Sequence, residues 1–255
     1  METELIYFEK PELKNPVLIE GLPGVGNVGR IAVSYLIEKL NAKKFAEIHS
    51  IYFFPLAIVS PNSEILPLSI DFYYYRGKRD MIFVIGDSQP VEYRGYYSIC
   101  EKILDVGMEY KVKEIVTTGG FGIGIEKQKP RVLGALTNLE DMKKLKKAGV
   151  YFEKENPIGS IFGVSGLLLS LAKKKKIRGY SLLGETIGFP ILTDPKAAEE
   201  VLKVLMKLFE VKVDLKDINK SVKQLEIFLK NIEEKTKQLT QQLQKPTKSY
   251  SEYIG

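Results

Sequence analysis

Residues 17–30 read VLIEGLPGVGNVGR, a short apolar run that leads into four closely spaced glycines. The apolar residues 17–19 predict a buried strand, and apolar residues at helical spacing predict a helix over 27–40, with Asn27 as its N-cap. A strand, a glycine turn and a helix in this order bring backbone N–H groups to a helix N-terminus. The segment therefore predicts an α/β unit, which is compatible with a dinucleotide site or with a tight structural turn.

The same alternation of strands and helices continues through the first 212 residues. Continuous apolar runs such as 81–86 are typical of strands buried on both faces of a parallel sheet. Strands are predicted over 45–54, 56–60, 81–86, 114–118, 132–137 and 180–184, an extended hairpin arm over 64–75, and helices over 91–107, 139–148, 160–175 and 195–209. We therefore expect residues 1–212 to form one α/β core domain, with a mainly parallel or mixed central sheet and helices on both faces.

Composition excludes several classes of protein. The chain has one cysteine, Cys100, and one histidine, His49, so an intrachain disulfide framework and a cysteine-based zinc site are excluded. The net charge of +6 is spread out, and its densest run, Lys173–Lys176, predicts a solvated helix end rather than a nucleic-acid site. No apolar run is long enough to cross a membrane and no signal peptide is visible, so we expect a cytoplasmic protein without a membrane partner.

Residues 215–243 carry a different pattern, because apolar residues recur at alternating spacings of three and four. Such uninterrupted heptads predict a long helix over 213–245 that pairs with copies of itself as a coiled coil. The predicted oligomerisation residues are Leu215, Ile218, Val222, Leu225, Leu229, Ile232, Leu239 and Leu243. Packing of this helix along the chain's own body is the alternative. Residues 246–255 are predicted to form a flexible tail.

Gly24, Gly26 and Gly29 match the spacing of the dinucleotide-binding fingerprint, and Glu47 lies about 20 residues further on. Glu47, however, falls inside a predicted strand rather than at its end, and no lysine or arginine is placed to hold a phosphate. The preferred interpretation is a sharp turn with close helix–strand packing, so no cofactor is predicted. An enzyme that binds a nucleotide or another small molecule at these glycines is the alternative.

Four carboxylates, Glu20, Asp71, Asp87 and Glu185, fall near predicted strand ends, where α/β proteins often place active sites. An acid–base pair among them is one interpretation. The preferred interpretation is that these side chains cap loops, so no catalytic residue is predicted. The single histidine is predicted to be a core or interface residue and the single cysteine a buried structural thiol, and no metal site is predicted.

Five segments form a recognisable set: 20–29 (EGLPGVGNVG), 118–120 (TGG), 161–169 (IFGVSGLLL), 182–186 (LLGET) and 194–198 (DPKAA). In this order they resemble the proteasome assembly chaperone family in its archaeal branch. The resemblance implies a three-layer α/β/α sandwich without an established catalytic centre. It also implies a homo-oligomer, a tetramer or a pentamer, that binds proteasome α-subunits or the α-ring.

Members of this family end in a hydrophobic–tyrosine–any tripeptide that docks between α-subunits. This chain ends in Glu252-Tyr253-Ile254-Gly255, with the tyrosine one position earlier and a glutamate before it. The partner-binding residues that the resemblance implies are Tyr250, Tyr253, Ile254 and Gly255.

We therefore expect a non-enzymatic proteasome-assembly chaperone or proteasome-binding adaptor that acts on the 20S α-ring. Two alternatives remain besides it. One is the enzyme described above, and the other is a structural oligomer that recruits an unrelated partner through its C-terminal helix. The sequence also leaves open the number of subunits and the formation of a hetero-oligomer with a paralogue.

Overall fold

The computed structural model describes residues 2–60, 62–155, 157–188, 193–220 and 222–223. The strands are β1 (Thr3–Tyr7), β2 (Val17–Gly21), β3 (Lys43–Ser50), β4 (Ala57–Val59), β5 (Ile65–Pro67), β6 (Ile70–Tyr75), β7 (Met81–Gly86), β8 (Glu114–Gly122), β9 (Val132–Leu136), β10 (Val150–Tyr151) and β11 (Arg178–Thr186). The α-helices are α1 (Val28–Leu40), α2 (Tyr93–Glu109), α3 (Met142–Ala148), α4 (Val164–Lys174) and α5 (Pro195–Phe209). Short 3-10 turns over Val25–Asn27 and Leu139–Asp141 precede α1 and α3.

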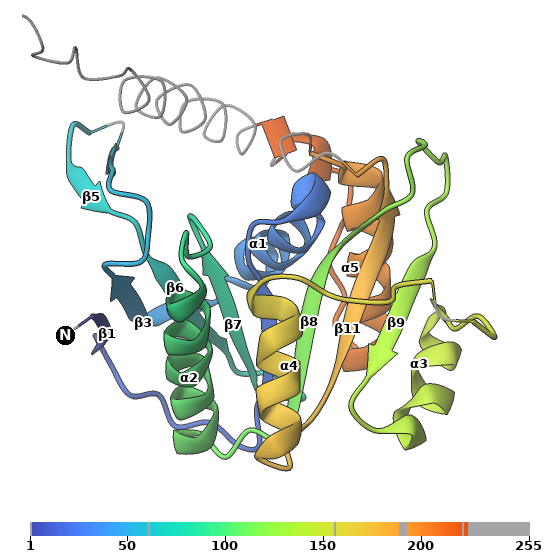
Figure 1. Cartoon of the computed structure of the whole chain (residues 1–255), viewed down its shortest axis with the longest axis horizontal. Coiled ribbons are helices and arrows are strands. Elements are labelled where there is room, and N and C mark those ends of the chain that lie inside the picture. The colour runs from blue at the N-terminus through green and yellow to red at the C-terminus, as the bar shows by residue number, and fades with distance from the viewer. Residues whose placement is uncertain (1, 61, 156, 189–192, 221, 224–255) are drawn as a thin grey trace, which may run out of the picture.

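The central layer is a mixed nine-stranded sheet in the order β1-β3-β6-β7-β2-β8-β11-β9-β10 (Figure 1). Its middle strands β7, β2, β8 and β11 are parallel to one another. On either side of them, β6 and β9 run antiparallel to their inner neighbours. Strands β4 and β5 form a separate small hairpin. The predicted three-layer α/β/α sandwich with a mixed sheet is therefore confirmed.

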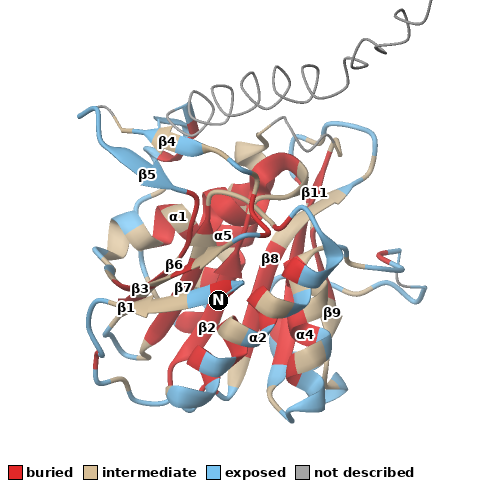
Figure 2. Cartoon of the chain, turned by 60° about the vertical axis from the view of Figure 1, so that its left-hand side comes forward, coloured by how far each residue is buried: buried red, intermediate tan, exposed pale blue. Residues whose placement is uncertain are grey.

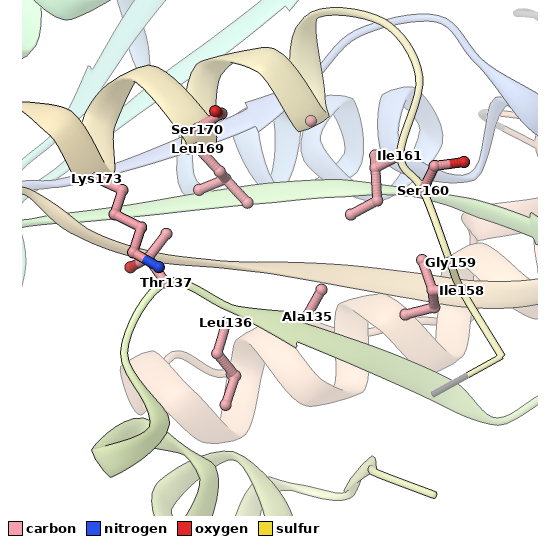
Figure 3. Close-up of a pocket in the computed structure, with 11 residues that line it drawn as sticks. Ala135, Leu136, Thr137, Ile158, Gly159, Ser160, Ile161, Leu169, Ser170 and Lys173 are labelled. Carbon is pink, nitrogen blue, oxygen red and sulfur yellow. The ribbon is translucent and has the colours of Figure 1, made fainter. Parts of the chain in front are cut away.

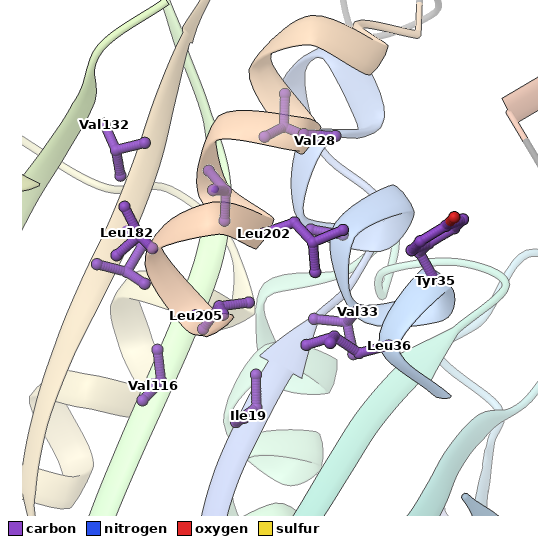
Figure 4. Packing of buried hydrophobic residues seen from close by; sticks show 14 of the residues in the cluster. Ile19, Val28, Val33, Tyr35, Leu36, Val116, Val132, Leu182, Leu202 and Leu205 are labelled. Carbon is purple, nitrogen blue, oxygen red and sulfur yellow. The ribbon is translucent and has the colours of Figure 1, made fainter. Parts of the chain in front are cut away.

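Helices cover both faces of the sheet, because alternate residues of each central strand point to opposite sides. In β2, Val17 and Ile19 pack into one core cluster together with α1 and α5, and Leu18 packs into the other with α2 and α4. Figure 4 shows the first cluster, in which α1 and α5 lie side by side over the strands. The central strands are buried along most of their length (Figure 2), so both faces contribute to the core.

Several predicted elements agree closely with the observed ones. Strand β7 and helix α5 have the predicted bounds, and the Asp194 carboxylate caps α5 by accepting a hydrogen bond from the Ala197 N–H at 2.9 Å. Helix α4 begins at Val164, later than predicted, because Gly163 before it has a φ of +85°. Strand β8 continues through the glycine-rich segment, where it pairs with β11. The short strands β1 and β10 lie at the two edges of the sheet, and the sequence does not predict them.

After α5 the chain passes back over α1. The Tyr35 hydroxyl of α1 donates a hydrogen bond to the Asp214 carbonyl at 2.6 Å. Ile218 and Val222 are buried in the same core cluster as α1, and Leu215 packs against it. The first residues of the heptad pattern therefore pack on the chain's own body. The coiled coil and the tail stay predictions, because the other predicted contact residues lie outside the described residues. These residues are Leu225, Leu229, Ile232, Leu239, Leu243, Tyr250, Tyr253, Ile254 and Gly255.

Candidate functional site

The carboxyl ends of the parallel strands surround a cavity of about 380 Å³. Its walls come from residues 22–25 after β2, 118–122 at the end of β8, and 160–163 with Ser165 at the start of α4. Parallel strands of an α/β sheet commonly place ligands at this edge, because the loops that follow the strands converge there. We therefore describe the side chains at this edge as the candidate functional site.

The three glycines of the fingerprint have different surroundings, and of the three only Gly24 is among the described residues that line this cavity. A Cβ atom on Gly29 would lie 2.3 Å from the Thr118 carbonyl oxygen, so α1 and β8 approach too closely for any side chain. Gly26 has a φ of +64°, and its carbonyl accepts a hydrogen bond from the Asp194 N–H at 2.8 Å. Gly24, by contrast, has an extended backbone and open space around it. At Gly26 and Gly29 the turn thus serves close packing of the chain on itself, which favours the structural interpretation.

Glu20, at the end of β2, is a fully buried carboxyl group. Its Oε1 accepts hydrogen bonds from the Leu22 N–H at 2.9 Å and the Ser165 hydroxyl at 3.2 Å. Its Oε2 has no hydrogen-bond partner among the described residues. Burial raises the pKa of Glu20 to about 7, and the hydrogen bonds to its carboxylate oppose that rise only in part. Near neutral pH the group therefore exchanges between an acid and a carboxylate.

Glu185, near the end of β11, has the opposite environment. Its Oε1 accepts a hydrogen bond from Arg131 Nε at 2.8 Å, and its Oε2 accepts one from Lys127 Nζ at 2.7 Å. Burial alone would raise the pKa of Glu185, but these two cations lower it to about 2. Glu185 is thus an ionised member of an ion-pair cluster rather than a proton donor.

The other two candidate carboxylates, Asp71 and Asp87, lie together. Ser69 links them, because its N–H donates to Asp87 Oδ2 at 3.3 Å and its hydroxyl donates to Asp71 Oδ1 at 2.7 Å. Arg30 lies 3.4 Å from Asp87, and Lys44 lies 2.9 Å from Asp71. Each aspartate thus has its own cation. The structure brings these two carboxylates together and gives Glu20 and Glu185 separate sets of partners.

The single histidine and the single cysteine belong to no cluster of metal ligands within the described residues. His49 Nε2 lies 2.6 Å from Glu47 Oε1 on a partly exposed part of β3. Cys100 is fully buried, as predicted, and burial raises its pKa well above the ordinary value. No helix in the described part of the chain is both long and apolar enough to pass through a bilayer.

A second cavity, of about 550 Å³, opens between α4 and β9 (Figure 3). Leu136, Ile161 and Leu169 supply apolar surface, and Lys173 is the one charged side chain among the described residues that line it. Ser160 and Ser170 add hydroxyl groups, and neither a histidine nor a carboxylate is among the described residues that line this cavity. This cavity therefore offers apolar contact area rather than a catalytic arrangement.

The hydroxyl groups that lie near Glu20 are not predicted from the sequence. Thr117 and Ser181 are buried in β8 and β11, and Ser165 reaches Glu20 from α4. The sequence carries a signal for the first two, since Thr117 and Ser181 each directly follow an apolar or aromatic residue within a predicted strand. Their proximity, however, depends on strand register, which the sequence pattern leaves undefined.

Comparison with known proteins decides the family. A family model described as the PAC2 family matches residues 18–233. This chain belongs to the PAC2 family. The finding confirms the expected resemblance to the archaeal proteasome assembly chaperones. The uncharacterized protein MJ1210 of Methanocaldococcus jannaschii is 35% identical to this PAC2 protein over 245 residues, which cover 95% of this chain and 93% of that protein.

Two solved structures from Pyrococcus furiosus resemble this PAC2 protein along nearly its whole length. PbaB, described as an archaeal proteasome activator, has a TM-score of 0.81 and 34% identity, and the match covers 91% of this chain and 99% of PbaB. PbaA, described as an archaeal homolog of proteasome-assembly chaperone, has a TM-score of 0.76 and 30% identity, covering 93% of this chain and 99% of PbaA.

Proposed function

We propose that this PAC2 protein is a non-enzymatic, cytoplasmic chaperone or activator of the proteasome that binds the α-ring. The observation that carries the proposal is the full-length similarity to PbaB and PbaA, one described as a proteasome activator and the other as an assembly-chaperone homolog. The glycine turn supports it, because Gly26 and Gly29 contact the chain itself. The four candidate carboxylates support it as well, since they do not converge on one acid–base centre.

Contact with the proteasome would use the tail residues Tyr250, Tyr253, Ile254 and Gly255. A tail with an aromatic side chain and a terminal carboxylate suits a receptor pocket that has a cation or backbone N–H groups. Self-association through the heptad residues beyond Val222 would hold several tails together. Several weak tails on one tetramer or pentamer bind a symmetric ring about 10²–10⁴ times more tightly than one tail does.

The direct test measures binding of recombinant α-subunit rings to the full-length protein by native mass spectrometry and biolayer interferometry. Deletion of residues 248–255, or the Tyr253→Ala substitution, should weaken binding at least tenfold. Tyr93→Ala removes an exposed tyrosine from the α/β body and is the matched control, which should bind like the parent. Equal binding by the tail deletion and the parent would exclude the tail as the contact. No α-ring binding by the full-length protein would refute the proposed function.

A further inference from the structure

The second cavity lies at one edge of the central sheet, between α4 and β9. Its volume is about 550 Å³. The last strand at this edge, β10, pairs with Val132 and Leu133 of β9. Leu136 lies further along β9 and lines the cavity, and no strand of the described residues lies beside it. The cavity is therefore bounded by a helix on one side and by an open stretch of strand edge on the other.

The backbone of Leu136 faces this open edge. The Thr137 N–H donates a hydrogen bond to the Gly179 carbonyl at 2.9 Å, so Thr137 faces β11. At the other end of β9, the Glu185 N–H donates to the Arg131 carbonyl at 2.9 Å, and the register between these two points is continuous. In an antiparallel pair, residues whose backbone groups face the partner alternate with residues whose groups face away. Leu136 therefore presents its N–H and C=O away from β11, where an extended peptide can add as a further strand.

The lining of the cavity favours an apolar peptide that carries a negative charge. Lys173 is the one charged side chain among the described residues of the lining. It is exposed, and it forms no ion pair with a described residue. Figure 3 shows Lys173 at the same end of the cavity as Thr137, with Ile158 and Ile161 at the other end. A carboxylate flanked by apolar side chains suits this arrangement, because Lys173 supplies the opposite charge and the isoleucines supply apolar contact.

The tail of the chain itself has this chemistry. Glu252 is the one acidic residue in 246–255, and Tyr250, Tyr253 and Ile254 surround it. In an extended segment, side chains two positions apart share a face, so Tyr250 and Ile254 flank the Glu252 carboxylate. Pro246 ends the predicted helix and leaves the residues after it available as an extended segment.

The chain is also long enough to bring the tail to the cavity. The 32 residues after Lys223 span at most about 110 Å when extended. A helix over 224–245 would shorten this reach to about 65 Å. A folded body of this length has a radius of gyration of roughly 18 Å, so either reach exceeds three times that radius.

We propose that this cavity binds the chain's own tail, with residues 250–254 added to the edge of β9 as a short strand and Glu252 paired with Lys173. A lipid carboxylate would also pair with Lys173, but it has no backbone groups for the strand edge. So short a contact, with one exposed cation, adds little to the free energy of unfolding. The docking itself goes beyond the proposed function, because both parts belong to this chain. Competition between the cavity and the α-ring for the tail follows from it, and that consequence rests on the proposed function.

Photo-crosslinking of the full chain tests the proposal, with p-benzoylphenylalanine in place of Tyr250 and mass spectrometry to locate the crosslinks. They should fall on residues that line the cavity, such as Leu136 and Leu169. Lys173→Glu and Glu252→Lys should each lower the crosslinked fraction by about fivefold or more, because each substitution places like charges together. The Lys173→Glu/Glu252→Lys double variant restores opposite charges and should recover about half of the parent value or more.

Ser170→Trp fills the cavity from an exposed position of α4, and it should lower the crosslinked fraction even if the charge variants fold poorly. Lys175→Glu is the matched control, which should crosslink like the parent, because Lys175 is not among the described residues that line the cavity. A parent without crosslinks in the cavity, or equal crosslinking in the parent, Ser170→Trp and Lys173→Glu, would overturn the tail site. The experiment contains no proteasome, so either result leaves α-ring binding unaffected, and a failure of α-ring binding leaves the tail site unaffected.

Discussion

Glu20 and Glu185 show how two glutamates near the ends of parallel strands acquire opposite properties. Both side chains are buried, and burial favours the neutral acid in both cases. Glu185 has Arg131 and Lys127 within hydrogen-bond distance, whereas the carboxylate of Glu20 has, among the described residues, only the Leu22 N–H and the Ser165 hydroxyl. The cations outweigh burial at Glu185, and nothing outweighs it at Glu20. Partner charge therefore decides that Glu185 is fully ionised at neutral pH while Glu20 is ionised only in part.

The raised pKa of Glu20 makes the stability of the wild-type protein fall as the pH rises. The folded protein holds this proton more tightly than the unfolded chain, so its stabilising effect is complete below about pH 4.5 and is lost as the pH rises through about 7. Relative to Glu20→Gln, the wild-type protein should lose about 3 kcal/mol of unfolding free energy across that range. Urea denaturation of both proteins at several pH values measures it. A difference that does not change with pH would contradict the raised pKa.

The lowered pKa of Glu185 predicts the reverse dependence. Its ion pairs stabilise the folded protein above about pH 4.5, and that stabilisation is lost as the pH falls toward 2. Arg131→Met should destabilise the protein by about 2 kcal/mol at neutral pH, a value reduced because Arg131 is partly exposed. Thermal unfolding of Arg131→Met and of the Arg131→Met/Glu185→Gln double variant measures the effect. The second substitution should restore part of the loss, and an additive further loss would argue against the pair.

The glycines between β2 and α1 are explained by close packing between elements rather than by a ligand. The backbones of α1 and β8 meet at Gly29, and the turn before α1 meets the strand end at Gly120, whose Cβ would lie 2.2 Å from the Val25 carbonyl oxygen. Close approach of this kind holds α1 over the sheet, where its apolar face is buried. Gly24 is the exception, because its neighbourhood is open.

This contrast yields a paired prediction on one turn. Gly29→Ala places a methyl group against backbone atoms of Thr118, which cannot move without displacing β8, and should cost about 3 kcal/mol of stability. Gly24→Ala meets no atom within 4 Å and should change stability by less than about 0.5 kcal/mol. Guanidinium denaturation of the two variants measures both effects. Equal effects would show that the spacing of the glycines matters for a reason other than packing.

The molecule as a whole is a three-layer body whose C-terminal segment begins as part of its core. Tyr35 holds the chain at Asp214, and Ile218 and Val222 are buried beside α1. The heptad pattern therefore combines two roles that are adjacent in sequence. Its first residues complete the α/β body, and we propose that the residues beyond them join copies of the protein.

A pair of truncations separates these two roles. A chain that ends at Lys223 keeps Ile218 and Val222 and should fold with its stability unchanged. A chain that ends at Asp214 loses the burial of both side chains and should be destabilised by about 3–5 kcal/mol. Thermal unfolding measures stability, and light scattering measures the number of subunits. A Lys223 truncation that remains a tetramer or pentamer would exclude the later heptad residues as the oligomer contact.

The sequence predicted the order of most elements and the layers that they form. Apolar runs such as 81–86 predict buried strands because both faces of a central strand need apolar residues, and the start of α5 follows from Asp194 as its N-cap. The edge strands β1 and β10 are not predicted, because they are short and their alternation of apolar and polar residues is weak. The four candidate carboxylates could be identified from the sequence, but the residues that form hydrogen bonds and ion pairs with them could not.

What the sequence determined by itself was local: where strands and helices begin, which faces are apolar, and that glycine is needed between β2 and α1. These properties follow from the conformational preferences of neighbouring residues and from the spacing of apolar side chains. Only the tertiary structure decided that Glu20, Thr117 and Ser181 form one buried row, and that the heptad pattern starts within the core. Both depend on strand register and on how the layers pack, which bring together residues from about 60 to about 180 positions apart in the chain.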